Sequence, residues 1–168
     1  GLSLIPYGTE DDLYVNGRIT GNSPYLTFEW KAGKDGKSYQ VQTQLIGEYN
    51  FPNALAAITI GRFFGVEDAK INEALAGYTP QNNRSQLKKT DDNTLIIDAY
   101  NANPTSMMAA LQNFRNMEVP HKMLILGDMR ELGAESAAEH QKIADYLKEC
   151  AFEKVWLVGD QFAAAEHS

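Results

Sequence analysis

Residues Ile96–Pro104 read IIDAYNANP, and this stretch decides the fold expected for the second half of the chain. It begins as an apolar run, which is typical of a buried strand, and it ends in two asparagines and a proline. Proline is common in the first turn of a helix. We therefore predict a strand over Thr94–Ala99 and a helix over Thr105–Phe114.

The same alternation continues toward the C-terminus. Apolar runs predict further strands at Lys122–Leu126 and Lys154–Val158, and the residues between them predict a helix over Ser136–Glu149. Strands separated by helices pair in parallel through right-handed crossovers. We expect an α/β domain of the Rossmann-like type, and an incomplete one, because a doubly wound sheet normally continues after its third strand.

Polar residues follow the first predicted strand at its carboxyl end, where open parallel sheets bind ligands. They are Asp98, Asn101 and Asn103. We favour a binding role, because a single helix cap does not require both asparagines. The alternative for Asn103 is that it mainly starts the next helix.

The second predicted strand ends in the loop GDMRELG, which carries Asp128, Arg130 and Glu131. These charges can position an amine or a carboxylate of a substrate, and the alternative is that the acids cap a helix. After the third strand, Gly159 and Asp160 are better explained by turn chemistry.

The first half of the chain shows a different pattern. Two alternating runs, Tyr25–Trp30 and Tyr39–Leu45, flank a polar turn and predict a β-hairpin. Gly33–Ser38 between them fits a short phosphate-loop pattern, but a phosphate loop precedes a helix, so we interpret these residues as a hairpin turn. The other expected elements are a short strand, two helices and a linker: Leu13–Val15, Gly47–Gly65 with Pro52 in its first turn, Val66–Gly77 and Tyr78–Asp92.

Asn50 and Asn53 lie three residues apart across this first helix start. In a helix they can present two amides to one edge of a ligand such as adenine. Capping by Asn50 is the commoner use of such a residue.

Composition narrows the classes of function. The chain has 168 residues, 43% of them hydrophobic, and a formal net charge of −7. This charge argues against nucleic acid and anionic membranes as partners, and no apolar run is long enough to span a bilayer. A single cysteine, Cys150, fits a reducing cytoplasm, and neither it nor His121 and His140 has metal-ligand spacing. The chain begins with glycine and has no signal peptide, so we expect a piece of a longer protein.

The order of these motifs resembles the Mur ligases of bacterial cell-wall synthesis. The resemblance runs from about Gly47 to Asp160 and rests on GEYNFPNALAA, Arg84 in NNRSQ, IIDAYNANPTSMMAAL, and LILGDMRELG with the downstream His140. The YNANP and GDMRELG elements point to the member that adds D-alanyl-D-alanine to a UDP-N-acetylmuramoyl tripeptide. The resemblance implies a cytoplasmic bacterial enzyme that uses ATP and Mg²⁺ and proceeds through an acyl phosphate.

The resemblance also implies roles for individual residues. Asn53 matches the asparagine that contacts adenine, and Asn50 is its companion. Arg84 matches the arginine that reaches the ATP phosphates, and Asp98 the aspartate that contacts the ribose. For the substrates, Asn101 and Asn103 are expected near the reacting groups, and the loop with Asp128, Arg130 and Glu131 on the D-alanyl-D-alanine side. No catalytic residue and no metal ligand is assigned within this chain.

The sequence departs from the family pattern in two ways. Tyr49 stands where the family often has histidine, and Ile97 and Ala99 flank Asp98 where paired aspartates are often found. The phosphate loop, the magnesium ligands and the UDP-sugar domain are expected upstream. Residues 1–80 are thus expected to end a central ATP-binding domain and residues 81–168 to begin the C-terminal Rossmann-like domain, a fragment inactive by itself.

Two alternatives remain at this point. The chain can be a non-catalytic, Rossmann-like module that binds a nucleotide or a protein. It can also come from another amide ligase of the same superfamily, such as a folylpolyglutamate-type enzyme, although YNANP and GDMRELG argue against this.

Overall fold

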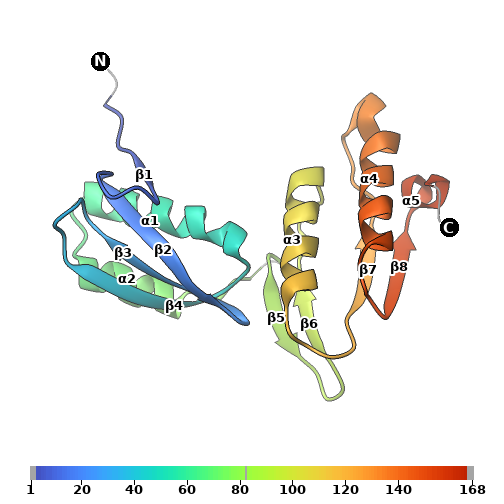
Figure 1. Ribbon diagram of the computed structural model, residues 1–168, viewed down its shortest axis with the longest axis horizontal. Helices are drawn as coiled ribbons and strands as arrows, with labels where there is room; N and C mark the ends of the chain where they lie inside the picture. The colour runs from blue at the N-terminus through green and yellow to red at the C-terminus, as the bar shows by residue number, and fades with distance from the viewer. Residues whose placement is uncertain (1–2, 82, 166–168) are drawn as a thin grey trace. The chain divides into compact units, whose positions relative to one another are not determined.

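A computed structural model describes residues 3–81 and 83–165 of the chain (Figure 1). The chain divides into two compact units, Gly1–Asp98 and Ala99–Ser168. The boundary expected between residues 80 and 81 stays a prediction. Asn82, in the NNRSQ segment, lies outside the described residues.

The first unit is built on a four-stranded sheet with the order β1-β2-β3-β4. The strands are β1 (Tyr7–Gly8), β2 (Val15–Asn22), β3 (Tyr25–Lys31) and β4 (Ser38–Ile46). β1 is parallel to β2, and the other neighbours are antiparallel. The predicted hairpin is confirmed as β3 and β4, and the phosphate-loop pattern is confirmed as a turn because Ser38 begins a strand.

One strand is much longer than expected. Of the predicted strand Leu13–Val15, only Val15 belongs to β2, which continues to Asn22. The sequence of β2, VNGRITGN, contains two glycines and few apolar residues, so its propensity for a strand is weak. It is held by backbone pairing along β3, an interaction that local sequence does not report.

Two helices pack on this sheet and form its core. The 3-10 helix η1 (Glu48–Asn50) leads into α1 (Phe51–Phe63), and α2 (Asp68–Gly77) follows. Both helices agree with the prediction, and Pro52 lies in the first turn of α1 as expected. The core joins the apolar face of the sheet to one side of α1 and to Ile71 of α2. Its buried residues are Val15, Leu26, Phe28, Trp30, Val41, Phe51, Ala54, Leu55, Ile58 and Ile71.

The expected linker Tyr78–Asp92 contains a strand that the sequence did not reveal. β5 (Gln86–Lys89) pairs antiparallel with β6 (Thr94–Ile97). We predicted that the strand at Thr94–Ala99, which is β6 here, would pair in a three-stranded parallel sheet. That prediction was wrong about its hydrogen-bonded partner, because β6 pairs with β5. β5 has the sequence QLKK with one apolar residue, so it shows no hydrophobic periodicity, and the short turn after it closes a hairpin.

The second unit pairs β7 (Met123–Gly127) in parallel with β8 (Lys154–Val158). Its helices are α3 (Pro104–Asn116), the 3-10 helix η2 (Gly133–Glu135), α4 (Ser136–Lys148) and the short α5 (Asp160–Ala164). The predicted strands and the helices α3 and α4 are confirmed within two residues at each end. Alternate residues of β7 and β8 pack against these helices in a core centred on Leu111, Met129, Ile143, Leu147 and Phe162.

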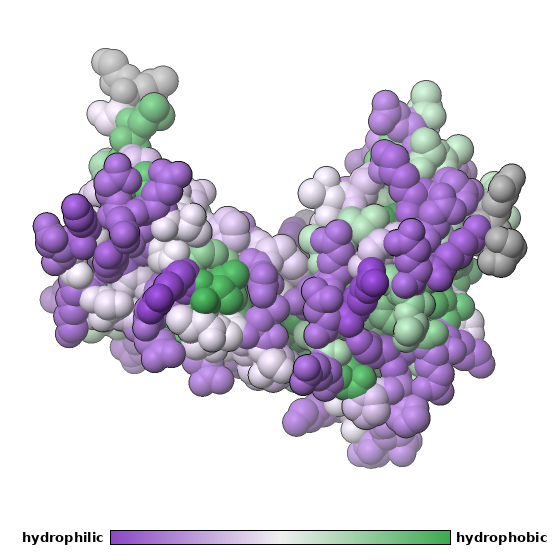
Figure 2. All heavy atoms as spheres, viewed as in Figure 1, coloured by the Kyte–Doolittle hydropathy of each residue, from purple (hydrophilic) through white to green (hydrophobic). Residues whose placement is uncertain are grey.

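The surface of this unit is mainly polar on the side shown in Figure 2, where hydrophilic residues predominate. The alternate residues of β7 and β8 that do not face the helices include exposed apolar side chains, of which Ile125 is the most accessible, with 73% of its surface exposed. Parallel strands are normally covered on both faces, so this exposed face is an unusual feature of the unit.

Candidate functional site

Asn50 and Asn53 lie together at the start of α1. The Asn50 amide Nδ2 donates to the Ile46 carbonyl at 2.9 Å, and Asn53 Nδ2 donates to Asn50 Oδ1 at 3.4 Å. Asn50 occupies the N-cap position but makes no side-chain capping bond, so the capping role expected for its side chain was wrong. Its amide is drawn back to the end of β4, and this leaves Asn53 exposed beside it.

Asp98 is joined to the same region by a short chain of hydrogen bonds. Its carboxylate accepts from the Ser85 backbone N–H at 3.3 Å and from the Ser85 hydroxyl at 3.4 Å. Ser85 Oγ lies 2.7 Å from the Tyr49 hydroxyl. Because an ionised carboxylate only accepts, the Ser85 hydroxyl donates to Asp98 and the Tyr49 hydroxyl donates to Ser85.

Tyr49 is the partly buried end of this chain. Burial raises the pKa of the Tyr49 phenol, the hydrogen bond with Ser85 opposes this, and the negative charge of Asp98 raises the pKa further. The phenol therefore stays protonated at neutral pH and remains a donor. The hydroxyl that replaces the histidine often found here has a specific partner within this chain.

Arg84 precedes Ser85 in a strained part of the backbone. Asn83 and Ser85 both have positive φ, at 58° and 45°, and Arg84 lies between them with its side chain exposed. Residues other than glycine adopt this conformation at a cost, which the bonds from Ser85 to Asp98 and Tyr49 help to offset. Tyr49 and Ser85 thus connect three predicted site residues. Tyr49 precedes Asn50 in the sequence, while Ser85 follows Arg84 and is hydrogen-bonded to Asp98.

In the second unit, Asn101 and Asn103 lie on the segment before α3. The Asn103 side chain accepts a hydrogen bond from the Ser106 N–H at 2.9 Å, so it caps the helix as the alternative prediction stated. Asn101 is exposed. One of the two asparagines is therefore explained by local structure, and Asn101 is not.

Asp128 has a defined structural role at the end of β7. Its two carboxylate oxygens accept from the backbone N–H groups of Gln161 and Phe162, both at 3.0 Å, at the start of α5. Burial alone would raise the pKa of the Asp128 carboxyl, but these two hydrogen bonds hold it below its usual range. Gly159 has no room for a side chain here, because an added Cβ would lie 2.2 Å from the Asp128 carboxyl carbon.

His140, noted in the sequence downstream of GDMRELG without an assigned role, is fully buried next to Asp128. Its Nδ1 lies 2.7 Å from the Ser136 carbonyl, and its Nε2 accepts from the Met129 N–H at 3.0 Å. A carbonyl only accepts, so Nδ1 carries the proton and the ring is neutral. The 3.7 Å approach of Nε2 to Asp128 is consequently not an ion pair, because that nitrogen has no hydrogen.

Arg130 and Glu131 follow Met129 directly and are both exposed. Glu131 has a positive φ of 64°, and Gly133 has one of 56°, so the backbone of this loop bends sharply. The structure thus presents one positive and one negative side chain next to each other, beyond the carboxyl end of β7.

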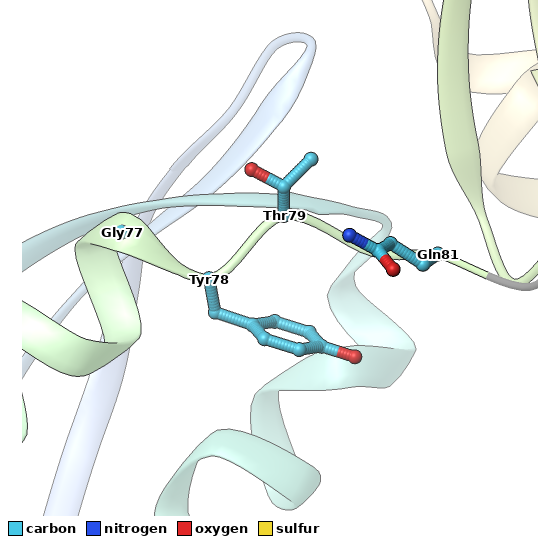
Figure 3. A pocket seen from close by; sticks show the side chains of 4 residues that line it. All are labelled: Gly77, Tyr78, Thr79 and Gln81. Atoms are coloured by element: carbon cyan, nitrogen blue, oxygen red, sulfur yellow. The ribbon is translucent and has the colours of Figure 1, made fainter.

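One hollow in the first unit lies apart from the predicted site residues. A hollow beside the end of α2 is lined by Gly77, Tyr78, Thr79 and Gln81 (Figure 3). It is partly open, and none of the predicted site residues lines it. The candidate nucleotide site therefore consists of the hydrogen-bonded residues around Tyr49, Ser85 and Asp98.

The residues described by the structure offer no metal centre. In residues 3–81 and 83–165, histidine, cysteine and acidic side chains form no group of three that could hold a metal ion. None of the helices in these ranges has the length and apolar character needed to span a bilayer.

Comparison with known proteins gives a consistent result. Residues 83–168 match the family described as "Mur ligase, glutamate ligase domain". The chain is 38% identical over 117 residues to the UDP-N-acetylmuramoyl-tripeptide–D-alanyl-D-alanine ligase of Bacillus subtilis, which covers 68% of this chain and 26% of that protein.

Solved structures agree with this similarity. The crystal structure of MurF from Acinetobacter baumannii aligns with a TM-score of 0.80 and 29% identity, over 92% of this chain and 34% of that one. MurF ligase from Thermotoga maritima, in complex with ADP, aligns over 96% of this chain and 37% of that one with a TM-score of 0.77, and its 17% identity supports the fold alone. These similarities confirm the α/β fold class, and the chain spans about a quarter to a third of the proteins that it matches.

Proposed function

Since this chain belongs to the Mur ligase family, we propose that it is a piece of an ATP-dependent ligase that joins D-alanyl-D-alanine to a UDP-N-acetylmuramoyl tripeptide. In this reaction ATP phosphorylates the terminal carboxylate of the tripeptide. The amine of D-alanyl-D-alanine then attacks the acyl phosphate, phosphate leaves and an amide forms. The proposed site of action is the bacterial cytoplasm, where ATP and UDP-linked precursors are available.

The contribution proposed for the first unit is nucleotide binding. The observation that carries it is the chain of hydrogen bonds from Tyr49 through Ser85 to Asp98, which relates the start of α1 to a strand end. Asn53 would pair with adenine through its amide, Arg84 would reach the phosphates, and Asp98 would accept from the ribose hydroxyls. Asn50 would orient the Asn53 amide, with which it already shares a hydrogen bond.

The contribution proposed for the second unit is substrate binding. Arg130 would pair with a carboxylate and Glu131 with an ammonium group, the two charges of a zwitterionic dipeptide. Asn101 and Asn103 would face the reacting groups, with Asn103 also holding α3. Asp128 would contribute by holding α5, because both of its oxygens already accept hydrogen bonds there.

Magnesium would neutralise the phosphate charge in such a reaction. The acidic and histidine residues described here form no cluster that fits it, so we assign no magnesium ligand and no metal-dependent step to this chain.

The nucleotide proposal can be tested on the 168-residue chain by titration with ADP, observed as amide shifts in NMR spectra. We expect the largest shifts near Asn53, Arg84 and Asp98. Asp98→Asn should weaken binding by about 10-fold, as expected for a hydrogen bond to a charged group. Asp92→Asn, in the exposed turn of the β5–β6 hairpin, is the matched control and should leave the affinity unchanged. Shifts that avoid all three residues would reject the proposed nucleotide site.

The proposed reaction is tested on the full-length protein that contains this chain. Phosphate release and amide formation should both require ATP, the UDP-linked tripeptide and D-alanyl-D-alanine. Nucleotide binding without amide formation from any amine acceptor would instead support the non-catalytic alternative.

A further inference from the structure

His140 is a fully buried titratable side chain to which the proposed function assigns no role. Both of its ring nitrogens are used, since Nδ1 donates to Ser136 in α4 and Nε2 accepts from the Met129 N–H after β7. The ring also packs edge-to-face on Phe162 of α5, with the centroids 4.7 Å apart. Three elements therefore meet at one imidazole.

We propose that His140 is a positioning residue that sets the backbone of the loop Met129–Glu131 and thereby orients Arg130 and Glu131 toward a zwitterionic substrate. The identity of that substrate, a dipeptide with a free amine and a free carboxylate, rests on the proposed function. The positioning itself rests only on contacts within the second unit.

The contacts explain why a histidine suits this role. The Met129 side chain is 2% exposed and enters the core, while its N–H is held by His140. The residue before the two exposed charges is thus fixed at both its backbone and its side chain. Because Glu131 adopts a left-handed conformation that costs energy, a loop without this anchor would relax to other conformations.

Asp128 and His140 each make hydrogen bonds next to the loop. The Asp128 N–H donates to the Val158 carbonyl at 3.1 Å, and the Asp128 carboxylate holds the first turn of α5. Phe162 from that same turn then packs against the imidazole. Loss of the acceptor at Nε2 removes the bond to the Met129 N–H and leaves the backbone pairing of β7 with β8 in place, so we expect the loop to be affected more than the strands.

Two substitutions separate positioning from simple packing. In His140→Gln, the side-chain oxygen reaches about as far as Nε2 and can still accept from the Met129 N–H. In His140→Asn, the amide reaches only about as far as Nδ1, so the bond to Ser136 is replaced and the bond to Met129 is lost. His121→Gln, at an exposed ring, is the control.

The experiment measures amide hydrogen exchange by NMR in the 168-residue chain. We expect His140→Asn to accelerate exchange at the Met129 amide by about 10-fold relative to amides of β7 and β8, as for the loss of one buried hydrogen bond. His140→Gln should restore most of the protection, and His121→Gln should change nothing in this loop. Equal acceleration across the whole unit in both variants would overturn the proposal, since it would show that His140 only fills the core.

A second measurement remains decisive if His140→Asn does not fold. The ¹⁵N shifts of the wild-type imidazole should show a neutral ring with the proton on Nδ1 and an unprotonated Nε2. A proton on Nε2 would overturn the proposal, because that nitrogen could not then accept from Met129.

The link to the substrate is measured separately on the full-length protein. We expect His140→Asn to raise the KM for D-alanyl-D-alanine by about 10-fold, with the KM for ATP unchanged and with rescue in His140→Gln. A rise in both KM values would overturn the link to the dipeptide. If the wild-type protein ligates no dipeptide, the proposed function fails while the exchange result still decides whether His140 positions the loop.

Discussion

Replacing Asp128 by asparagine should destabilise the second unit in a pH-dependent manner. Asparagine has the same shape but only one acceptor oxygen. One of the two 3.0 Å hydrogen bonds from the Gln161 and Phe162 N–H groups is therefore lost. The asparagine NH₂ group would then face a backbone N–H, so two donors meet. The Asp128 side chain is 20% exposed, so water screens part of its charge. We expect the free energy of unfolding to fall by about 1 to 2 kcal/mol at neutral pH.

The dependence on pH follows from the lowered pKa of the Asp128 carboxyl. A carboxyl with a lower pKa in the folded state adds stability above its unfolded-state value, about 3.9, and loses it as pH falls through the folded-state pKa. The difference in unfolding free energy between wild type and Asp128→Asn should therefore be full above about pH 5 and should shrink as the pH falls through the lowered folded-state pKa.

The assay is urea unfolding over a pH series, followed by the fluorescence of Trp156 in β8. A Trp30→Phe background removes the only other tryptophan, which lies in the first unit. Asp160→Asn is the control: it removes a charge at the same helix end without these two bonds, and should cost less than about 1 kcal/mol. A difference for Asp128→Asn below about 0.5 kcal/mol at neutral pH, or one that does not change with pH, would refute the reasoning.

Four further substitutions test the packing of the two units. Leu55→Ala removes a core side chain from α1 and should cost about 2 to 5 kcal/mol, whereas Ile60→Ala on the exposed side should cost less than about 1, as measured by urea unfolding of the first unit. Gly159→Ala should lower the melting temperature of the second unit, because the positive φ of 124° and the Asp128 carboxyl leave no room for a Cβ; an unchanged melting temperature would contradict that geometry. Ile125→Lys on the exposed strand face should reduce binding of a hydrophobic dye with a stability change below about 0.5 kcal/mol, and a large loss of stability would show that this side chain is packed.

Elements with strong periodicity could be predicted from the sequence. The β3–β4 hairpin, α1, α3, α4 and β8 were all expected, because each carries an apolar pattern with clear turn or proline signals. The motif order also indicated the family that the comparisons confirmed. These features depend on residues that are close in sequence, where local physics dominates.

The elements that the sequence missed depend on pairing. β2 and β5 have few apolar residues, and each exists because a neighbouring strand satisfies its backbone N–H and C=O groups. The partner of each is the next strand along the chain, β3 for β2 and β6 for β5, but the side chains of β2 and β5 carry no apolar alternation that would reveal the pairing.

The same division applies to the candidate site. The sequence by itself identified Asn53, Arg84 and Asp98 as residues of interest, and it placed Asn103 at a helix start. Only the tertiary structure showed that Tyr49 and Ser85 hold Asp98, and that His140 holds the loop after β7. Residue types and spacing are local properties, whereas the proton on Nδ1 of His140 and the bonds made by Asp128 are set by atoms that only folding brings together.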